Sequence, residues 1–290
     1  MPYNHAGEIG DVWKHLPLCD ILFIENPIRY HETNSAYSGY TIAKNPNTEY
    51  GIFKLLSKPD GIVYDSKYIN VLYKNGIDKM HYTGSPGLAM EILSNRANYF
   101  FHDIEIDALK DVEEYANTKG LQNNVQTFCG DSIKRFLSDD YKLKEDDFVF
   151  LDPYSPFDKN EDGKNFFDVF EKVIIHKSKA LLWYGYDTLQ NKREISEHLS
   201  QLAKNHNVSI WSFDLWQKSM TENECTINPG VPGCGLACAY LSENSVEILK
   251  KYLQIIAQYY SNETYCNCAK LRMKKATGSM VRNYDHQNCE

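Results

Sequence analysis

Short apolar runs alternate with helical stretches along most of this sequence, and that alternation is the feature that most restricts its fold. FVFL before Asp152 and ALLWYGY ending at Tyr186 have the length of buried strands, and segments with apolar residues at helical spacing separate such runs. A chain of this kind buries its strands in a largely parallel sheet whose crossover helices cover both faces. The pattern therefore predicts an α/β fold.

The boundaries of the expected elements come from the same pattern. We expect strands at Cys19–Glu25, Asn98–Glu105, Asn124–Asp131, Asp147–Pro153, Lys179–Tyr186, Asn207–Trp216 and Gly233–Leu241. A helix is expected to begin at Ser85, because a serine cap followed by Pro86 suits the unpaired amides of a first turn. The division predicted for the chain is a main domain at 1–36 and 83–250, a small helical insertion at 37–82, and a C-terminal helix and tail at 251–290.

Composition limits the function classes. The formal charge of -8, from 31 basic and 39 acidic residues, argues against nucleic-acid binding by overall charge, so such a partner must be held locally. The sequence has no apolar run of the roughly 20 residues that a membrane helix needs, nor a signal-peptide core at its start. We therefore expect a cytoplasmic monomer without a membrane partner. A candidate basic patch lies in the tail and comprises Lys270, Arg272, Lys274, Lys275 and Arg282.

Six of the eight cysteines fall in the last quarter of the sequence. They are Cys225, Cys234, Cys238, Cys266, Cys268 and Cys289. Cytoplasmic thiols are kept reduced, so we expect no disulfides, and the spacings miss the paired C-x2-C pattern of structural zinc sites. The sequence predicts no metal site.

Acidic residues close several of the expected strands: Glu25, Asp103, Asp131 and Asp152. In an open α/β sheet the ligand crevice lies at the carboxyl ends of the strands, so these acids predict a nucleotide-type cofactor site, although each taken alone also suits a helix cap. Asp152-Pro153-Tyr154 is more specific. A carboxylate and a backbone carbonyl that accept both hydrogens of an exocyclic base amine localise its lone pair for methylation, and Tyr154 or Phe157 offers a stacking surface. A proline turn without chemistry is the competing interpretation.

Taken in order, these motifs resemble the RlmJ family of S-adenosylmethionine-dependent adenine methyltransferases, which modify large-subunit ribosomal RNA. The resemblance rests on HAGEIGDVWKH at 5–15, TEYGI, YTGSP, HDIE, GDSIKRF, FLDP, LLWY and GVPGCGLACAYL, and it extends over about residues 5–245. It implies a Rossmann-like methyltransferase sheet with a small helical insertion subdomain. It further implies S-adenosylmethionine as cofactor and nucleic acid, RNA rather than DNA, as substrate.

Residue roles follow from the same resemblance. It implies cofactor contacts, ribose and adenine binding included, from His15, Ser85, Asp103, Asp131 and Ser132, and we add Glu25 from its place at an expected strand end. The implied catalytic residues are Asp152, with Pro153 supplying its carbonyl, and Tyr154. His5 and Phe157 are the expected substrate contacts, and Tyr3 is a further candidate.

Two departures from the family pattern keep alternatives open. The family signature Asp-Pro-Pro-aromatic is replaced by Asp152-Pro153-Tyr154-Ser155, and the Asp-Thr-His before the family's glycine-rich loop is matched here to Glu25-Asn26-Pro27. A glycine-rich loop lets the backbone approach a cofactor closely, so its loss bears on cofactor binding. The alternatives are a methyltransferase acting on a protein, peptide or small metabolite, and a non-catalytic binding protein.

Overall fold

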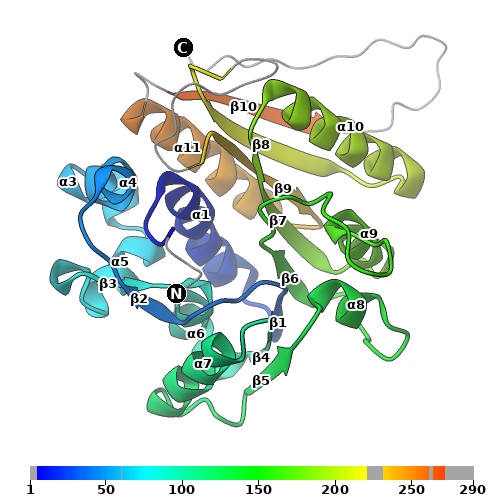
Figure 1. The fold of residues 1–290 in the computed structure, drawn as a ribbon, viewed down its shortest axis with the longest axis horizontal. Helices are drawn as coiled ribbons and strands as arrows, with labels where there is room; N and C mark the ends of the chain where they lie inside the picture. The colour runs from blue at the N-terminus through cyan, green and yellow to red at the C-terminus, as the bar shows by residue number, and fades with distance from the viewer. Residues whose placement is uncertain (1–4, 60, 221–230, 261–263, 272–290) are drawn as a thin grey trace.

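An eight-stranded sheet forms the centre of the computed structural model, which describes residues 5–59, 61–220, 231–260 and 264–271 (Figure 1). The strand order is β10-β8-β9-β7-β6-β1-β4-β5. The strand bounds are β1 Arg29–Glu32, β4 Asn98–Asp103, β5 Val125–Cys129, β6 Phe148–Leu151, β7 Lys179–Tyr186, β8 Ile210–Gln217, β9 Gly233–Ala239 and β10 Thr264–Leu271. The sheet spans both halves of the chain and gathers the acid-ended strands side by side.

Five neighbouring strands of the sheet run parallel, and the three strands toward the β10 edge include antiparallel pairs. β1 pairs in parallel with β4 and β6, β4 with β5, and β6 with β7. β9 runs antiparallel between β7 and β8, and β10 pairs antiparallel with β8. Because the chain leaves β1 toward β4 and later returns to β6 on its other side, the strand order reverses at β1, where ligands bind in open α/β sheets. The structure confirms the predicted Rossmann-like sheet.

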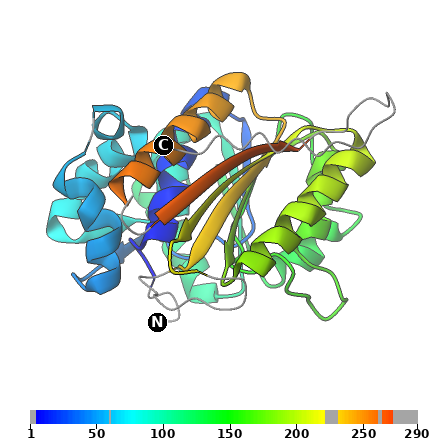
Figure 2. The same cartoon turned by 90° about the horizontal axis from the view of Figure 1, so that it is seen from above.

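Helices cover both faces of the sheet, as Figure 2 shows from above. The helices of one face are α1 Ile9–Glu25, α5 Lys67–Lys74, α6 Ser85–Leu93, α7 Ile106–Thr118 and α11 Glu243–Tyr259. Those of the other face are α8 Ser132–Leu137, α9 Phe166–Ile175 and α10 Leu189–His206. β6 shows how the sequence specifies two cores: Phe148 and Phe150 pack into the first, while Val149 and Leu151 pack into the second. This period of two with both faces apolar is typical of a central parallel strand.

The inserted segment is a cluster of short helices joined at its base by two strands. Its elements are β2 Gly39–Thr41, α2 Pro46–Thr48, η1 Glu49–Phe53, α3 Lys54–Ser57, α4 Gly61–Tyr64, α5, η2 Ile77–Lys79 and β3 His81–Thr83. β2 and β3 form a separate antiparallel pair. The remaining short helix, η3 Ser94–Arg96, follows α6 in the main domain. The insertion packs on α1 and thereby lies next to the carboxyl edge of β1 (Figure 1).

Two of the strand predictions need correction. The strand predicted at Cys19–Glu25 is wrong, because this run is the second half of α1, a 17-residue helix buried along most of its length. A short apolar run does not by itself distinguish a buried helix from a buried strand. The central strand is instead β1, whose sequence RYHE is too short and too polar to resemble one. β10 was also missed and lies in the predicted tail.

The tail and its cysteines differ from expectation where the structure describes them. Cys266 forms a disulfide, so the prediction that all thiols stay reduced is wrong. Lys270 lies over the ring of Trp211 at 4.7 Å, and the other four members of the predicted basic patch fall outside the described residues. In the part of the chain that the structure describes, no group of three His, Cys, Asp or Glu side chains could hold a metal ion. Over the same residues, no helix has the length and apolar character needed to span a bilayer.

Candidate active site

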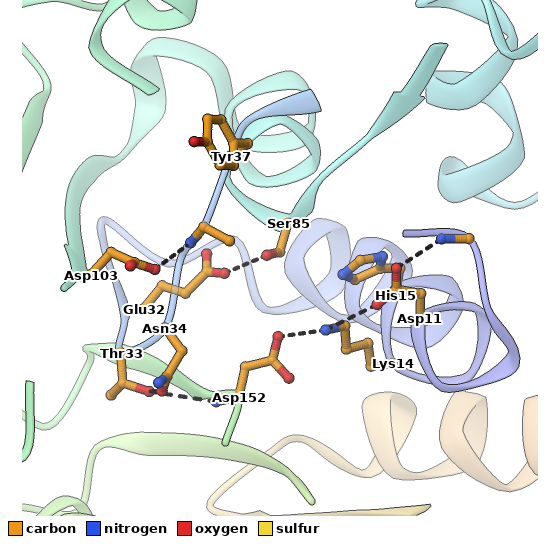
Figure 3. A network of polar contacts seen from close by, with 12 residues as sticks. Asp11, Lys14, His15, Glu32, Thr33, Asn34, Tyr37, Ser85, Asp103 and Asp152 are labelled. Atoms are coloured by element: carbon orange, nitrogen blue, oxygen red, sulfur yellow. Dashed lines mark hydrogen bonds and ion pairs between the residues drawn. The ribbon is translucent and has the colours of Figure 1, made fainter. Parts of the chain in front are cut away.

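The loop that follows β1 is tied to both neighbouring strands at the carboxyl edge of the sheet (Figure 3). Toward β6, the amide of Thr33 donates to the carbonyl of Phe150 at 3.1 Å, and the amide of Asp152 donates to Oγ1 of Thr33 at 3.4 Å. Toward β4, the amide of Ser35 donates to the carbonyl of His102 at 3.0 Å. These bonds bring residues 33–35 and Asp152 to one place, at the reversal of strand order.

Asp152 is held by a lysine from the first helix. Nζ of Lys14 lies 2.6 Å from Oδ2 of Asp152 and 3.1 Å from Oδ1 of Asp11, and Asp11 also accepts from the amide of Gly7 at 2.9 Å. Burial raises the pKa of Asp152 to about 6, although Lys14 acts to lower it. Burial acts to lower the pKa of Lys14, but the two carboxylates outweigh it and raise that pKa, so Lys14 remains charged.

The second oxygen of Asp152 is available for a ligand. Among the residues that the structure describes, Oδ1 of Asp152 has no hydrogen-bond partner although it is buried. Buried acceptors are nearly always satisfied in native proteins, so an unsatisfied one at a strand end indicates where a donor group binds. The site thus combines a fixed cation with a carboxylate oxygen that can accept from a bound amine.

Glu32, the last residue of β1, is a second buried acid in the site. It accepts hydrogen bonds from the hydroxyl of Tyr30, at 2.8 Å, and from that of Ser85. Burial raises the pKa of Glu32 to about 8, because these two hydrogen bonds compensate only part of the cost of desolvation. Ser85 therefore points into the site from the first turn of α6, as Figure 3 shows.

The start of α6 and the loop after β1 approach so closely that only glycine fits. A Cβ added at Gly84 would lie 2.2 Å from the carbonyl oxygen of Tyr37, and one at Gly87 would lie 2.4 Å from that of Ser38. Within the loop Ala36 adopts a φ of 53°, the left-handed region that favours glycine. The loop thus has a left-handed residue at Ala36 and passes close to the start of α6.

Asp103, the last residue of β4, binds the backbone of the loop that follows β1. Its Oδ2 accepts from the amide of Ala36 at 2.8 Å, and its Oδ1 accepts from the amide of Glu105 at 2.9 Å. Asp103 thereby fixes the loop after β1 to the end of β4. Asp131 caps α8 through the amide of Lys134 and accepts from Asn160 at 2.7 Å. Ser132 is buried in the first turn of that helix.

His15 lies in the same first helix as Lys14, with one nitrogen engaged. Nδ1 is 2.8 Å from the hydroxyl of Tyr82, which is in turn 2.9 Å from that of Tyr68. Burial lowers the pKa of His15 to about 3, so the ring is neutral. Within the described residues its buried Nε2 has no hydrogen-bond partner, which leaves that atom for a ligand.

The structure separates the two candidate aromatics. Tyr154 lies beside the end of β7 with its ring 6.3 Å from that of Trp183, and it is 44% exposed. Phe157 instead packs between Phe167 and His198 in the second core, at 4.8 and 5.7 Å, so the structure does not bring it together with Asp152.

The structure places two other predicted site residues away from this network. Glu25 ends α1 rather than a strand, and it binds Lys179 at the start of β7 and Ser242 at the start of α11. These partners lie at the amino end of β7 and at the start of α11, so the structure does not bring Glu25 together with the other predicted cofactor residues. His5 is exposed and pairs with Glu8 at 3.2 Å, while Tyr3 is outside the described residues.

Sequence reasoning missed the residues at the true end of the central strand. Glu25-Asn26-Pro27 was matched to the family's Asp-Thr-His, but the structure places Glu32-Thr33-Asn34 at the end of the central strand. An acid followed by threonine is a signal that could have found this stretch. Lys14 was also missed, although the opening motif contains it.

Some known proteins resemble this chain in sequence or in fold. A family model described as Conserved hypothetical protein 95 matches residues 69–212. Ribosomal RNA large subunit methyltransferase J of Haemophilus influenzae is 24% identical over 213 residues, which cover 67% of this chain and 73% of that protein.

Among solved structures, the crystal structure of protein LPL1258 from Legionella pneumophila superposes with a TM-score of 0.72. It is 18% identical, and the superposition covers 91% of this chain and 97% of that one. At this identity the likeness shows the fold. Both sequence matches agree with the motifs on which the expected resemblance rests, and the chain is similar in sequence to an RlmJ methyltransferase.

Proposed function

We propose that this methyltransferase uses S-adenosylmethionine to methylate the exocyclic amine of adenine in RNA. The observation that carries the proposal is the state of Asp152: one oxygen is fixed by Lys14, and the other is buried and unpaired in the described structure. The amine of adenine is a weak nucleophile because its lone pair is delocalised into the ring. An acceptor that binds one of its hydrogens localises the lone pair toward the incoming methyl group.

Asp152 and Pro153 would each bind one hydrogen of the amine. The carboxylate of Asp152 accepts one hydrogen, and the carbonyl of Pro153 accepts the other. Lys14 keeps the carboxylate ionised and oriented, since its ammonium is bonded to Asp152 on one side and to Asp11 on the other. Catalysis is then mainly positioning of the two reactants and of this acceptor pair.

The cofactor would be held along the carboxyl edge of the sheet. S-adenosylmethionine supplies a methyl group that its sulfonium has already activated. The residues present fit its polar groups: the carboxylate of Asp103 suits the ribose hydroxyls, and Asp131 and Ser132 suit the adenine. Nε2 of His15 and the hydroxyl of Ser85 suit the methionine part, with Asn34 as a further candidate at the end of β1.

RNA is the proposed acceptor because the relative with matching motifs acts on ribosomal RNA according to its name. The net charge of -8 and the replacement of the family's second proline by Tyr154 favour a second candidate, a diverged enzyme acting on a protein, peptide or small metabolite. Both candidates share the cofactor and the catalytic acid, so they differ only in the methyl acceptor.

A partition experiment tests this proposal. The protein is incubated with methyl-tritiated S-adenosylmethionine and a cell extract, which is then separated into RNA, DNA, protein and small molecules. We expect label in RNA with the wild type and none with Asp152→Asn, because the remaining amide oxygen would bond to Lys14 and the amide nitrogen, which only donates, would face the amine. Label confined to protein or to small molecules would favour the second candidate. Binding of the cofactor without any methyl transfer would favour a non-catalytic binding protein.

A further inference from the structure

A chain of three polar side chains leads from the inserted segment to the first helix. The hydroxyl of Tyr68, in α5, lies 2.9 Å from that of Tyr82, in β3. The hydroxyl of Tyr82 lies in turn 2.8 Å from Nδ1 of His15, in α1. All three residues are buried, so bulk water does not supply a missing partner. Each proton of the chain therefore needs an acceptor in the protein or in a ligand.

The number of protons in this chain is fixed. His15 is neutral, so one of its two ring nitrogens carries a proton and the other accepts. Each tyrosine hydroxyl donates one hydrogen bond. Three protons are thus distributed over two hydrogen bonds, and one proton is left over. It lies on Tyr68, on Tyr82 or on Nε2 of His15, according to the direction in which the chain runs.

The end of the chain at Tyr68 decides between these arrangements. Within the described residues the hydroxyl of Tyr68 has no hydrogen-bond partner except Tyr82, and Nε2 of His15 has none. If the leftover proton were on either tyrosine, two buried atoms would be unsatisfied: that O–H donor and the acceptor nitrogen Nε2. If Tyr68 donates to Tyr82 and Tyr82 donates to Nδ1, only Nε2 remains, as a protonated nitrogen. The hydrogen-bond geometry favours this last arrangement.

A proton on Nε2 restricts the ligand group that His15 can bind to an acceptor. The ring leaves α1 beside Lys14, the residue that holds Asp152 (Figure 3). Lys14 is already bonded to the carboxylates of Asp11 and Asp152, and Glu32 is a further buried acid of the site. The carboxylate is the only anionic group of S-adenosylmethionine, and these acids oppose its approach. A neutral N–H donor that is still unpaired in the described structure suits that carboxylate best.

We propose that Tyr68 and Tyr82 are positioning residues that hold His15 as a hydrogen-bond donor, through Nε2, for the carboxylate of the cofactor. The inference rests on the proposed function for the identity of that cofactor. The bond made by one ring nitrogen of a histidine sets the protonation of the other, so the tautomer is fixed before the cofactor binds. Both tyrosines belong to the inserted segment, which thereby takes part in cofactor recognition.

NMR of the protein with isotope-labelled histidine measures the tautomer without any cofactor. Two-bond proton–nitrogen correlations distinguish a protonated ring nitrogen from an unprotonated one, and the spectrum of His15→Gln identifies the signals of His15. We expect the wild type at neutral pH to have a protonated Nε2 and an unprotonated, hydrogen-bonded Nδ1. In Tyr82→Phe the Nδ1 signal should move toward that of a nitrogen without a hydrogen bond. A protonated Nδ1 in the wild type would overturn the inference.

Calorimetry with two cofactors separates a positioning role from a structural one. Decarboxylated S-adenosylmethionine lacks the group that His15 is proposed to bind. We expect Tyr82→Phe to weaken binding of S-adenosylmethionine by about threefold to tenfold, the range of one hydrogen bond, and to leave binding of the decarboxylated cofactor unchanged. Tyr68→Phe should have a smaller effect, because Tyr82 still donates to Nδ1. Tyr73→Phe, at an exposed tyrosine of the same helix, is the matched control and should bind both cofactors like the wild type.

The two measurements keep this inference separate from the proposed function. Equal weakening of both cofactors by Tyr82→Phe would indicate a merely structural role and would contradict the inference, as would unchanged binding of S-adenosylmethionine. A wild type that does not bind S-adenosylmethionine would contradict the proposed function. The NMR spectrum would then still decide whether the two tyrosines hold His15 as a donor.

Discussion

Replacing Lys14 with methionine should move the pH dependence of methyl transfer toward higher pH. Lys14 and Asp152 are 2.6 Å apart, with side chains only 13% and 7% exposed, so water screens their attraction weakly. At an effective dielectric constant of about 20, Coulomb's law gives about 6 kcal/mol for that separation. A quarter of this, about 1.5 kcal/mol, already corresponds to about one pKa unit.

The pH dependence shifts upward because the reaction needs the ionised form of Asp152. Burial raises the pKa of Asp152 to about 6 even with Lys14 present, and Asp11 also acts to raise it. In the wild type the rate should therefore rise as the pH increases through about 6. Without the lysine the pKa of Asp152 should reach about 7 or more, so that at neutral pH half or less of the protein carries the required carboxylate.

The assay is kcat/KM for the acceptor between pH 5 and 9, with Lys14→Arg as a variant that keeps the charge. We expect the midpoint of the acidic limb to shift upward by at least about one unit in Lys14→Met and to stay near that of the wild type in Lys14→Arg. If Lys14→Met proves inactive, the carboxyl of Asp152 can be titrated by NMR with labelled aspartate. An unshifted titration would refute the role assigned to the ion pair.

Three other predictions test the cofactor loop, the stability and the location of the site. Gly87→Ala should lower the affinity for S-adenosylmethionine by about tenfold or more, because its Cβ would meet the carbonyl of Ser38, whereas Gly61→Ala, where no atom lies within 4 Å, should leave calorimetric binding unchanged. Burial acts to raise the pKa of Glu91, but its bonds to two lysines and a tyrosine prevail and lower it to about 2. Because water screens the two exposed lysines, Glu91→Gln should cost about 1 kcal/mol in denaturant unfolding at pH 7, with the difference shrinking as the pH falls from about 4.5 toward 2. Cys129 is exposed and pairs in register with Asp103, so S-adenosylmethionine should slow its alkylation, as followed by peptide mass spectrometry, and unprotected labelling would speak against a cofactor at this edge.

The fold was predictable from sequence wherever local pattern and burial agree. β6 and β7 are apolar along their length and are buried on both faces, so a simple hydrophobic run identifies them. The start of α6 was also predicted, from a proline in a first helical turn. The prediction that Ser85 caps this helix is wrong, because Gly84 is the N-cap and the hydroxyl of Ser85 donates to Glu32.

β1 was not predictable in the same way, because contacts distant in sequence make its polar residues suitable for burial. His31 is buried against the hydroxyl of Tyr141, at 2.7 Å, and near Asp147, while Glu32 is buried against Ser85. Partners 50 to 120 residues away leave no trace in a local pattern, so RYHE reads as a polar turn. The sequence analysis therefore assigned the apolar half of α1 as the first strand.

The site was predicted in part for a related reason. Acids at the ends of β4 and β6 follow strands that the pattern identifies, so Asp103 and Asp152 could be placed at one edge before the structure was known. The ion pair with Lys14 joins residues 138 positions apart, and the bond between His15 and Tyr82 joins residues 67 positions apart. Such pairings arise only from the folded topology.

Transfer of a trideuteromethyl group is the most direct measurement of the central claim. RNA is incubated with the protein and S-adenosylmethionine carrying that label, digested to nucleosides and analysed by mass spectrometry. We predict labelled N6-methyladenosine with the wild type, and a yield lower by a factor of about 100 or more with Asp152→Asn, the scale of one lost transition-state contact, at unchanged cofactor affinity. Label on another atom or another class of molecule, or full activity of Asp152→Asn, would contradict the account.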